Sequence, residues 1–60
     1  MPSPETLKLV REKLKDADDK IRAWENEISQ MKRAGIDTTR QATDLEQIKA
    51  QVTAMRSVYG

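Results

Sequence analysis

The chain has 60 residues, of which 35% are charged and 37% hydrophobic, and its 11 Lys and Arg against 10 Asp and Glu give a net charge of +1. This length allows one domain at most, and the balanced charge creates no field that would favour nucleic acid or an acidic membrane. The sequence contains neither Cys nor His, which excludes disulfides and thiolate zinc sites and removes the commonest general base.

The opening stretch MPSPETLK lacks the apolar core of a signal peptide. No apolar run in the sequence approaches the ~20 residues that span a bilayer. We therefore expect a cytoplasmic protein without a membrane segment, in which residues 1–60 form a single domain. A chain of this size buries only about 60% of the surface that it exposes when unfolded, so contacts with a partner are expected to stabilise it.

Residues 4–34 carry the pattern of an amphipathic helix. Ser3 is a favourable N-cap, Pro4 suits the first helical position, and Glu5 places a negative charge at the positive end of the helix dipole. Apolar residues then recur at alternating steps of three and four, at Leu7, Val10, Leu14, Ala17, Ile21, Trp24, Ile28 and Met31. This spacing predicts a heptad seam, an apolar stripe in which the residues alternate between positions a and d, starting with a at Leu7.

The segment AGIDTT predicts a turn. Extending the first register beyond it would place Lys49 and Arg56 in the apolar seam, where unpaired charges are costly to bury. Gly35 fits the left-handed position after a helix, and Ile36 would then pack against Met31, as in a Schellman motif. The chain is therefore expected to turn back on itself here.

A second helix is predicted over residues 38–57. Asp37 is a suitable N-cap, with Thr38 as a substitute whose partner Gln41 completes a capping box. Apolar residues again step by three and four, at Leu45, Ile48, Val52, Met55 and Tyr59. The predicted fold is all-α, an antiparallel two-helix hairpin with helices over about 4–34 and 38–57.

Charges at the edges of the seams test this pairing. In an antiparallel pair Glu25 falls near Lys49 and Asp18 falls near Arg56, and such solvated pairs contribute a few tenths of a kcal/mol each. On the other edge Glu27 approaches Asp44. This like-charge approach either weakens the pairing or marks an edge where something else intervenes.

The two predicted helices differ in length. At ~1.5 Å per residue they span roughly 46 Å and roughly 30 Å, so the tip of the first is expected to have no partner within the chain. Five residues are predicted to contact a protein partner: Leu7, Leu9, Val10, Leu14 and Trp24. The simplest partner is a second copy, which gives a dimeric four-helix bundle. Another helical partner, or further helices of a longer chain, are the alternatives.

Trp24 allows two interpretations. An indole is too large for a plain two-stranded seam, and the small residues Ala17, Ala23, Ala50 and Ala54 offer the walls of a hole that a partner helix would complete. Alternatively, Trp24 is a core residue that lies sideways over the hairpin, since tryptophan is commonly buried in large part but not completely.

The alternative function is a small nucleic-acid-binding regulator. Lys8, Arg11 and Lys15 form a basic stripe along the first helix, where they are candidates for contact with phosphates. Acidic residues interleave with them, however, and the two aromatic residues, Trp24 and Tyr59, lie in the seams and not at positions for base stacking. The pattern favours a solvated, solubilising face.

No catalytic, metal or cofactor site is predicted. The acidic run KDADDK lies within a helix and lacks the glycine turn and closing glutamate of a calcium loop. The serines have no candidate base nearby, and two helices enclose no pocket for a small-molecule substrate. The sequence therefore predicts a non-catalytic structural or protein-interaction module that mediates self-association or docking in a larger assembly.

Overall fold

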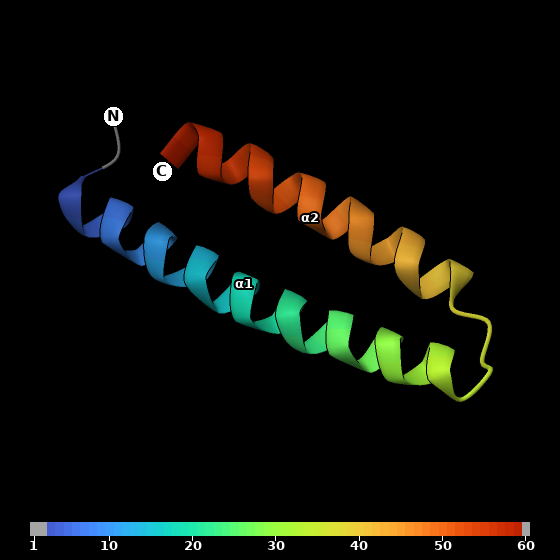
Figure 1. Ribbon diagram of the computed structural model, residues 1–60. Coiled ribbons are helices and arrows are strands. Elements are labelled where there is room, and N and C mark those ends of the chain that lie inside the picture. Colours follow the sequence, from blue (N-terminus) through green and yellow to red (C-terminus); the bar gives the residue numbers. More distant parts are fainter. Residues whose placement is uncertain (1–2, 60) are drawn as a thin grey trace.

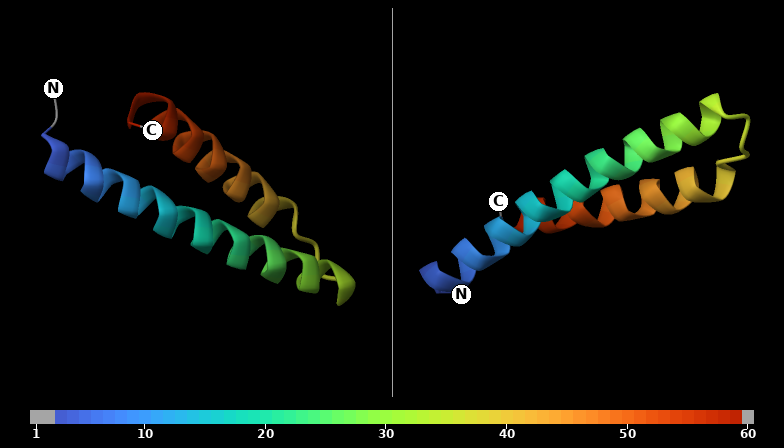
Figure 2. Two further views of the ribbon diagram at one scale, coloured as in Figure 1. Left: turned by 60° about the vertical axis from the view of Figure 1, so that its left-hand side comes forward. Right: turned by 90° about the horizontal axis from the view of Figure 1, so that it is seen from below.

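The computed structural model describes residues 3–59. They form two α-helices, α1 (Pro4–Arg33) and α2 (Thr39–Tyr59), which run antiparallel and pack side by side (Figure 1). Seen from two further directions, the start of α1 and the end of α2 lie at the same end of the molecule, opposite the turn (Figure 2). The molecule measures 48 × 15 × 10 Å. The predicted all-α antiparallel hairpin is confirmed.

The start of α1 follows the predicted capping chemistry. The Ser3 hydroxyl oxygen accepts a hydrogen bond from the Thr6 backbone N–H at 3.2 Å, and Pro4 occupies the first helical position with Glu5 in the first turn. A backbone N–H in the first turn of a helix has no hydrogen-bond acceptor within the helix. Proline, which has no N–H, therefore loses no hydrogen bond at this position. The helix therefore begins where the sequence predicts.

The turn after α1 is a Schellman motif. Gly35 has φ +82°, its N–H donates to the Lys32 carbonyl at 3.0 Å, and the Ile36 N–H donates to the Met31 carbonyl at 3.0 Å. These bonds satisfy carbonyls that the last helical turn would otherwise leave unpaired. Helix α1 ends at Arg33, one residue before the predicted end, because Ala34 is its C-cap.

Asp37 holds the start of α2. Its carboxylate accepts hydrogen bonds from the Thr39 hydroxyl at 2.7 Å and from the Thr39 backbone N–H at 3.0 Å, and these bonds lower the pKa of Asp37 below its usual value. The Thr38 carbonyl accepts from the Ala42 N–H at 2.8 Å. The predicted capping box from Thr38 to Gln41 does not form within residues 3–59, where the Thr38 side chain is instead buried.

The core is a single row of aliphatic side chains between the helices. The buried residues are spaced by seven within each helix: Leu14, Ile21 and Ile28 in α1, and Leu45 and Val52 in α2. Val10, Ala17 and Ile48 are partly buried against them. No described side chain is less than 2% exposed, because two helices form only one interface and leave their outer sides in solvent.

The predicted seams are covered only in part. Trp24 and Met55, both members of the predicted seams, are 41% and 46% exposed. Only the a positions are consistently buried. Ala17 is partly buried against the core, whereas Met55 stays exposed, because one helix covers completely only about one row of its neighbour's side chains.

The unpaired tip of α1 is shorter than predicted. Helix α2 continues to Tyr59, two residues beyond the predicted end, so it reaches further along α1. Val10 packs against the core, which corrects the expectation that it has no partner within the chain. Leu7 is half-buried, whereas Leu9 is 58% exposed.

Substituting Gly35 by alanine is expected to lower the free energy of unfolding by about 1–2 kcal/mol, because φ of +82° forces a Cβ into a strained backbone conformation. A Cβ at this position meets no atom within 4 Å, so the cost is conformational and not a clash. Gly35→Asn is the matched control and should lose less, since asparagine tolerates this region. Urea unfolding measures the stability of both variants. An alanine variant as stable as the wild type would contradict the left-handed conformation of residue 35.

Candidate interaction surfaces

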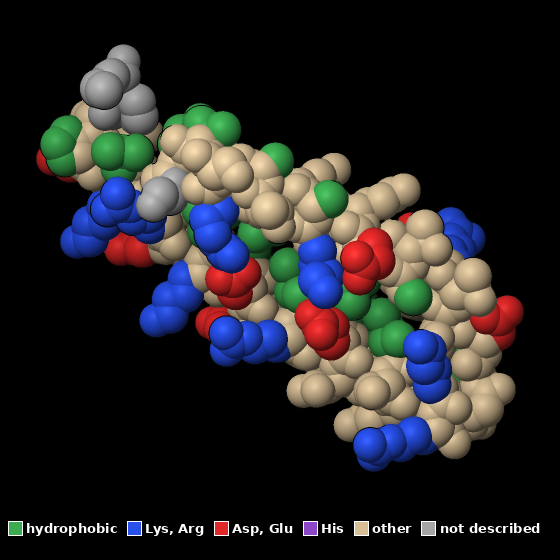
Figure 3. All heavy atoms as spheres, turned by 45° about the horizontal axis from the view of Figure 1, so that its top comes forward, with side chains coloured by type: hydrophobic (Ala, Val, Ile, Leu, Met, Phe, Trp, Pro, Cys, Tyr) green, Lys and Arg blue, Asp and Glu red, His purple; other side chains and the backbone are tan. Residues whose placement is uncertain are grey.

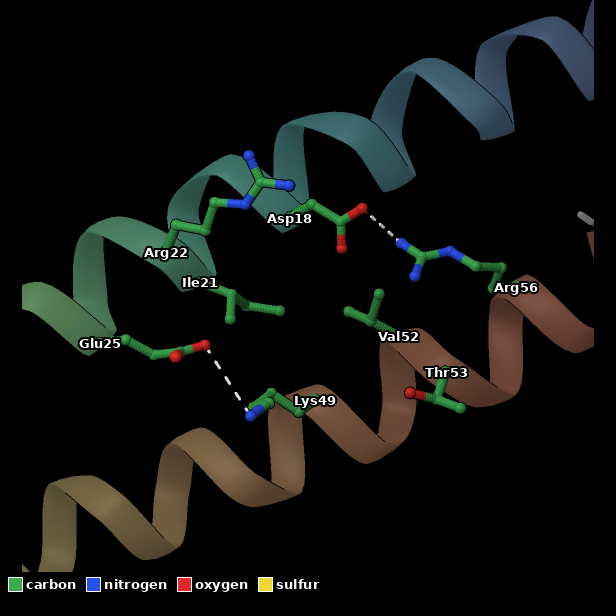
Figure 4. A pocket seen from close by; sticks show the side chains of 8 residues that line it. All are labelled: Asp18, Ile21, Arg22, Glu25, Lys49, Val52, Thr53 and Arg56. Carbon is green, nitrogen blue, oxygen red and sulfur yellow. Dashed lines mark hydrogen bonds and ion pairs between the residues drawn. The ribbon is translucent and has the colours of Figure 1, made fainter.

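Two ion pairs join α1 to α2 along one edge of the hairpin. The Arg56 guanidinium donates to the Asp18 carboxylate at 2.5 Å, and the Lys49 ammonium lies 3.8 Å from the Glu25 carboxylate. In Figure 4 these pairs flank Ile21 and Val52, which extend toward one another between the helices. Both predicted complementary pairs are confirmed, and they fix which side of each helix faces this edge.

The Asp18–Arg56 pair shifts the titration of both groups. The hydrogen bond from Arg56, together with the positive charges of Arg56 and Arg22, holds the pKa of the Asp18 carboxyl below its usual value against the opposing effect of desolvation. The same hydrogen bond raises the pKa of Arg56. The pair is half-exposed, so solvent screens it and it reports the register of the helices more than it stabilises them.

We call this side of the hairpin the grooved flank, because shallow hollows follow the line between the helices. The basic residues that line these hollows are Arg11, Lys15, Arg22, Lys32, Lys49 and Arg56. The acidic residues that line them are Asp18, Glu25 and Glu46. Six cations against three anions give the grooved flank a net charge of +3, although the whole chain carries only +1. Figure 3 shows Lys and Arg side chains, with Asp and Glu side chains between them, along the groove above hydrophobic atoms on its floor.

The structure brings together two of the three residues predicted to contact nucleic acid. Arg11 and Lys15 line one hollow of the grooved flank with Arg56, around the buried Leu14. Lys8 is exposed on α1 but does not line that hollow. The sequence stripe was confined to the first helix, and the contribution of Arg56 from α2 became visible only once the hairpin fixed the relative position of the two helices.

The opposite side of the hairpin carries exposed hydrophobic side chains, and we call it the apolar flank. Its members are the large hydrophobic side chains that stay exposed within residues 3–59: Leu9 (58%), Trp24 (41%), Ile36 (50%), Met55 (46%) and Val58 (74%). None of the five lines a hollow of the grooved flank. Ile36 lies in the turn, and the other four occupy positions c, d and g of the helices. These positions lie on the other side of the buried a row from the e positions that form the ion pairs.

The residues predicted to contact a partner lie in three environments. Leu9 and Trp24 lie on the apolar flank and are accessible. Leu14 is 6% exposed and belongs to the core of the hairpin, so it is not available to a partner. Leu7 and Val10 are half-buried.

The sequence reasoning missed two members of the apolar flank, Ile36 and Met55, which it assigned to contacts inside the hairpin. Val58, which lies beyond the predicted end of the second helix, is 74% exposed. The number of helices in the predicted fold would have identified them as exposed. Two helices cover one row of side chains each, so apolar residues beyond that row remain exposed.

Exposed charged residues of both signs lie on the apolar flank as well. Lys20 and Glu27 occupy g positions of α1 on either side of Trp24, and both are exposed. Glu27 lines a hollow with Met31 and Ile36. Neither Lys20 nor Glu27 forms an ion pair within residues 3–59. Both side chains are therefore available for a contact outside the described chain.

The Asp18–Arg56 pair predicts a pH dependence. Because the folded pKa of Asp18 is lowered, its contribution to stability is present above the unfolded pKa of about 4 and is lost as the pH falls through the folded pKa. The melting temperature of Asp18→Asn should therefore fall below that of the wild type at pH 7, and the difference should shrink below about pH 4. Thermal unfolding followed by circular dichroism measures this difference.

The control for this prediction is Asp19→Asn, which removes a carboxylate from the same helix without breaking an ion pair of the described chain. Arg56→Gln should reproduce the trend of Asp18→Asn. A difference between Asp18→Asn and the wild type that stays constant from pH 7 to pH 2 would show that the ion pair does not link stability to pH.

Residues 3–59 contain no group of three or more acidic side chains arranged to hold a metal ion. Neither helix in this part of the chain is long and apolar enough to cross a membrane. No protein family model, curated protein or solved structure matches the chain.

Proposed function

We propose that this protein is a non-catalytic self-association module in which a second copy of the chain covers the apolar flank. The observation that carries this proposal is the distribution of exposed hydrophobic side chains. Within residues 3–59, the five large ones lie on one flank of a hairpin whose core is a single row of five buried residues. Concentration of apolar surface on one side of a small domain is typical of a protein interaction site.

The charges support a second copy as the occupant. The grooved flank carries a net charge of +3, so two copies that met through it would repel each other. The apolar flank carries exposed charges of both signs, with Lys20 and Glu27 on the same helix. Two apolar flanks therefore meet without net repulsion, and the resulting assembly of four helices gives each hairpin the second layer that it lacks.

Sedimentation equilibrium over a concentration series from about 1 to 500 μM tests this proposal. The wild type should associate to a dimer, and Met55→Glu on the apolar flank should weaken the association. Thr53→Glu introduces the same charge two residues away on the grooved flank and is the matched control, with no loss of association expected. A wild type that remains monomeric over the whole range would refute the proposal.

Nucleic-acid binding is the second candidate function, favoured by the net charge of +3 on the grooved flank. Of the six cations, Lys49 and Arg56 form ion pairs with acidic side chains in the described chain. The other four are Arg11, Lys15, Arg22 and Lys32. Of these, Arg11 and Lys15 line one hollow together, so they are the best placed to bind phosphates. The apolar flank carries the exposed tryptophan, so the grooved flank offers no stacking surface of that kind and its ligand would be a duplex backbone.

Titration of a labelled duplex at several salt concentrations tests this second candidate. If it is correct, binding weakens as salt rises, and a triple variant with Lys8, Arg11 and Lys15 changed to alanine loses part of the salt slope, about one unit for each phosphate contact removed. Absence of binding at 20 mM salt would eliminate it, and this outcome would leave the self-association proposal unaffected.

A further inference from the structure

We propose that the two copies are related by a two-fold axis that is perpendicular to α1 and passes between Ala23 and Trp24. In this arrangement α1 lies antiparallel over α1 of the second copy, and the two turns lie at opposite ends of the assembly. This inference rests on the proposed self-association and adds the orientation and register of the copies. Three independent features of the apolar flank lead to it.

The first feature is charge complementarity. Lys20 is three residues before Ala23 and Glu27 is three residues after Trp24, so the axis places Lys20 of each copy opposite Glu27 of the other. Two ion pairs form at once, because symmetry repeats the contact. Within one chain Lys20 and Glu27 are seven residues apart, or roughly 10 Å along the helix, so they do not satisfy each other. Their pairing requires the second copy.

The second feature is the complementary size of the residues at the axis. Trp24 is 41% exposed on the hairpin, and its neighbour Ala23 is exposed and small. The axis places Trp24 of each copy against Ala23 of the other, so each indole fills the space that an alanine leaves. A large side chain thus meets a small one at the centre of the interface, where buried aromatic residues contribute most to association.

The third feature lies at the ends of the apolar flank. Leu9 is 58% exposed and lies 14 residues before Ala23, and Ile36 is 50% exposed and lies 12 residues after Trp24. They are therefore nearly equidistant from the axis in opposite directions. The proposed arrangement places Leu9 of each copy near Ile36 in the turn of the other and covers an exposed apolar side chain at each end.

The alternative two-fold axis, parallel to the helices, places α1 over α2 of the second copy with both turns at one end. The ion pairs put residue 25 of α1 level with residue 49 of α2, so this axis brings Glu27 within one helical turn of Asp44 of the second copy, a like-charge approach. It also leaves Leu9 past Tyr59, the last described residue of α2. The perpendicular axis avoids both problems.

Disulfide trapping tests the position of the axis, since the chain has no cysteine of its own. A residue beside a two-fold axis lies close to its own copy, so Ala23→Cys should yield mostly disulfide-linked dimer under mild oxidation. Ser29→Cys on the grooved flank is the matched control and should remain unlinked. If the wild type is a dimer by sedimentation but neither variant is trapped, the proposed axis is wrong although self-association stands. A monomeric wild type refutes both.

Charge reversal tests the register. Lys20→Glu should raise the dimer dissociation constant roughly tenfold, because it places two negative charges at each contact. Combining it with Glu27→Lys should restore the wild-type value, whereas Arg22→Glu on the grooved flank should leave the dissociation constant unchanged. If the double variant associates as weakly as the summed effects of Lys20→Glu alone and Glu27→Lys alone predict, Lys20 and Glu27 do not meet across the axis.

Discussion

Replacing Trp24 by alanine is expected to raise the dimer dissociation constant by about a thousandfold. Trp24 is the largest side chain on the apolar flank and is 41% exposed on the isolated hairpin. This exposed part of the indole is available for contact with the second copy. A buried interface tryptophan contributes at least ~2 kcal/mol, and the substitution removes one from each copy, which amounts to ~4 kcal/mol. Sedimentation equilibrium gives the dissociation constants of both proteins.

The control for this prediction is Trp24→Phe, which keeps an aromatic ring and should lie between the wild type and the alanine variant. Helix content measured at high protein concentration shows whether the hairpin itself persists in the alanine variant. An unchanged dissociation constant for Trp24→Ala would place the interface elsewhere on the molecule and would also remove the central contact of the proposed two-fold arrangement.

Replacing Ile21 by alanine is expected to destabilise the hairpin by about 2–5 kcal/mol, the usual cost of removing a buried aliphatic side chain. Ile21 is 8% exposed and is the middle residue of the three that α1 contributes to the core. Truncating its side chain interrupts the row of core residues between Leu14 and Ile28 and leaves a cavity opposite Val52. For a domain of this size such a loss is comparable with the total stability, so much of the helical signal should disappear at 25 °C.

Circular dichroism with thermal or urea unfolding measures the effect of Ile21→Ala. Ile21→Val should cost about 0.5–1.5 kcal/mol, and Thr53→Ala, at an exposed position across from it, should change stability by less than ~0.5 kcal/mol. All three proteins must be compared at one concentration, since association with a second copy raises the apparent stability by mass action. An alanine variant that unfolds like the wild type would contradict the observed core.

The elements of the fold that could be predicted from the sequence are those set by local chemistry and periodicity. The break between the two heptad registers located the turn, and only glycine adopts the φ of +82° at residue 35 without strain. The same periodicity paired Asp18 with Arg56 and Glu25 with Lys49, because an antiparallel pair brings these edge positions together.

The accessible surface could not be predicted in the same way. An apolar stripe identifies which residues prefer burial but not how many neighbours are present to bury them. Trp24 and Met55 continue the stripes of α1 and α2 and yet remain exposed, because the second helix of a hairpin covers one row only. The number of helices that pack against a stripe depends on the assembly and cannot be predicted from the periodicity of one chain.

The charge pattern was hidden from the sequence for a related reason. Positive and negative residues alternate along α1, which suggested a mixed solvated face, and the totals cancel to +1. Folding sorts them, so that cations from α1 join Lys49 and Arg56 from α2 on one side. The net charge of +3 on the grooved flank arises from two helices together and has no counterpart in any continuous stretch of sequence.

The brevity of the turn separates two timescales. Only residues 34–38 join α1 to α2, so the loss of chain entropy on closing the hairpin is small, and folds dominated by such local contacts form in microseconds to milliseconds. Two molecules at micromolar concentration, with a typical association rate constant of 10⁵–10⁷ M⁻¹s⁻¹, take on the order of a second to meet productively. Encounter between finished hairpins, and not the formation of each one, therefore limits the speed at which the proposed assembly appears after dilution from denaturant.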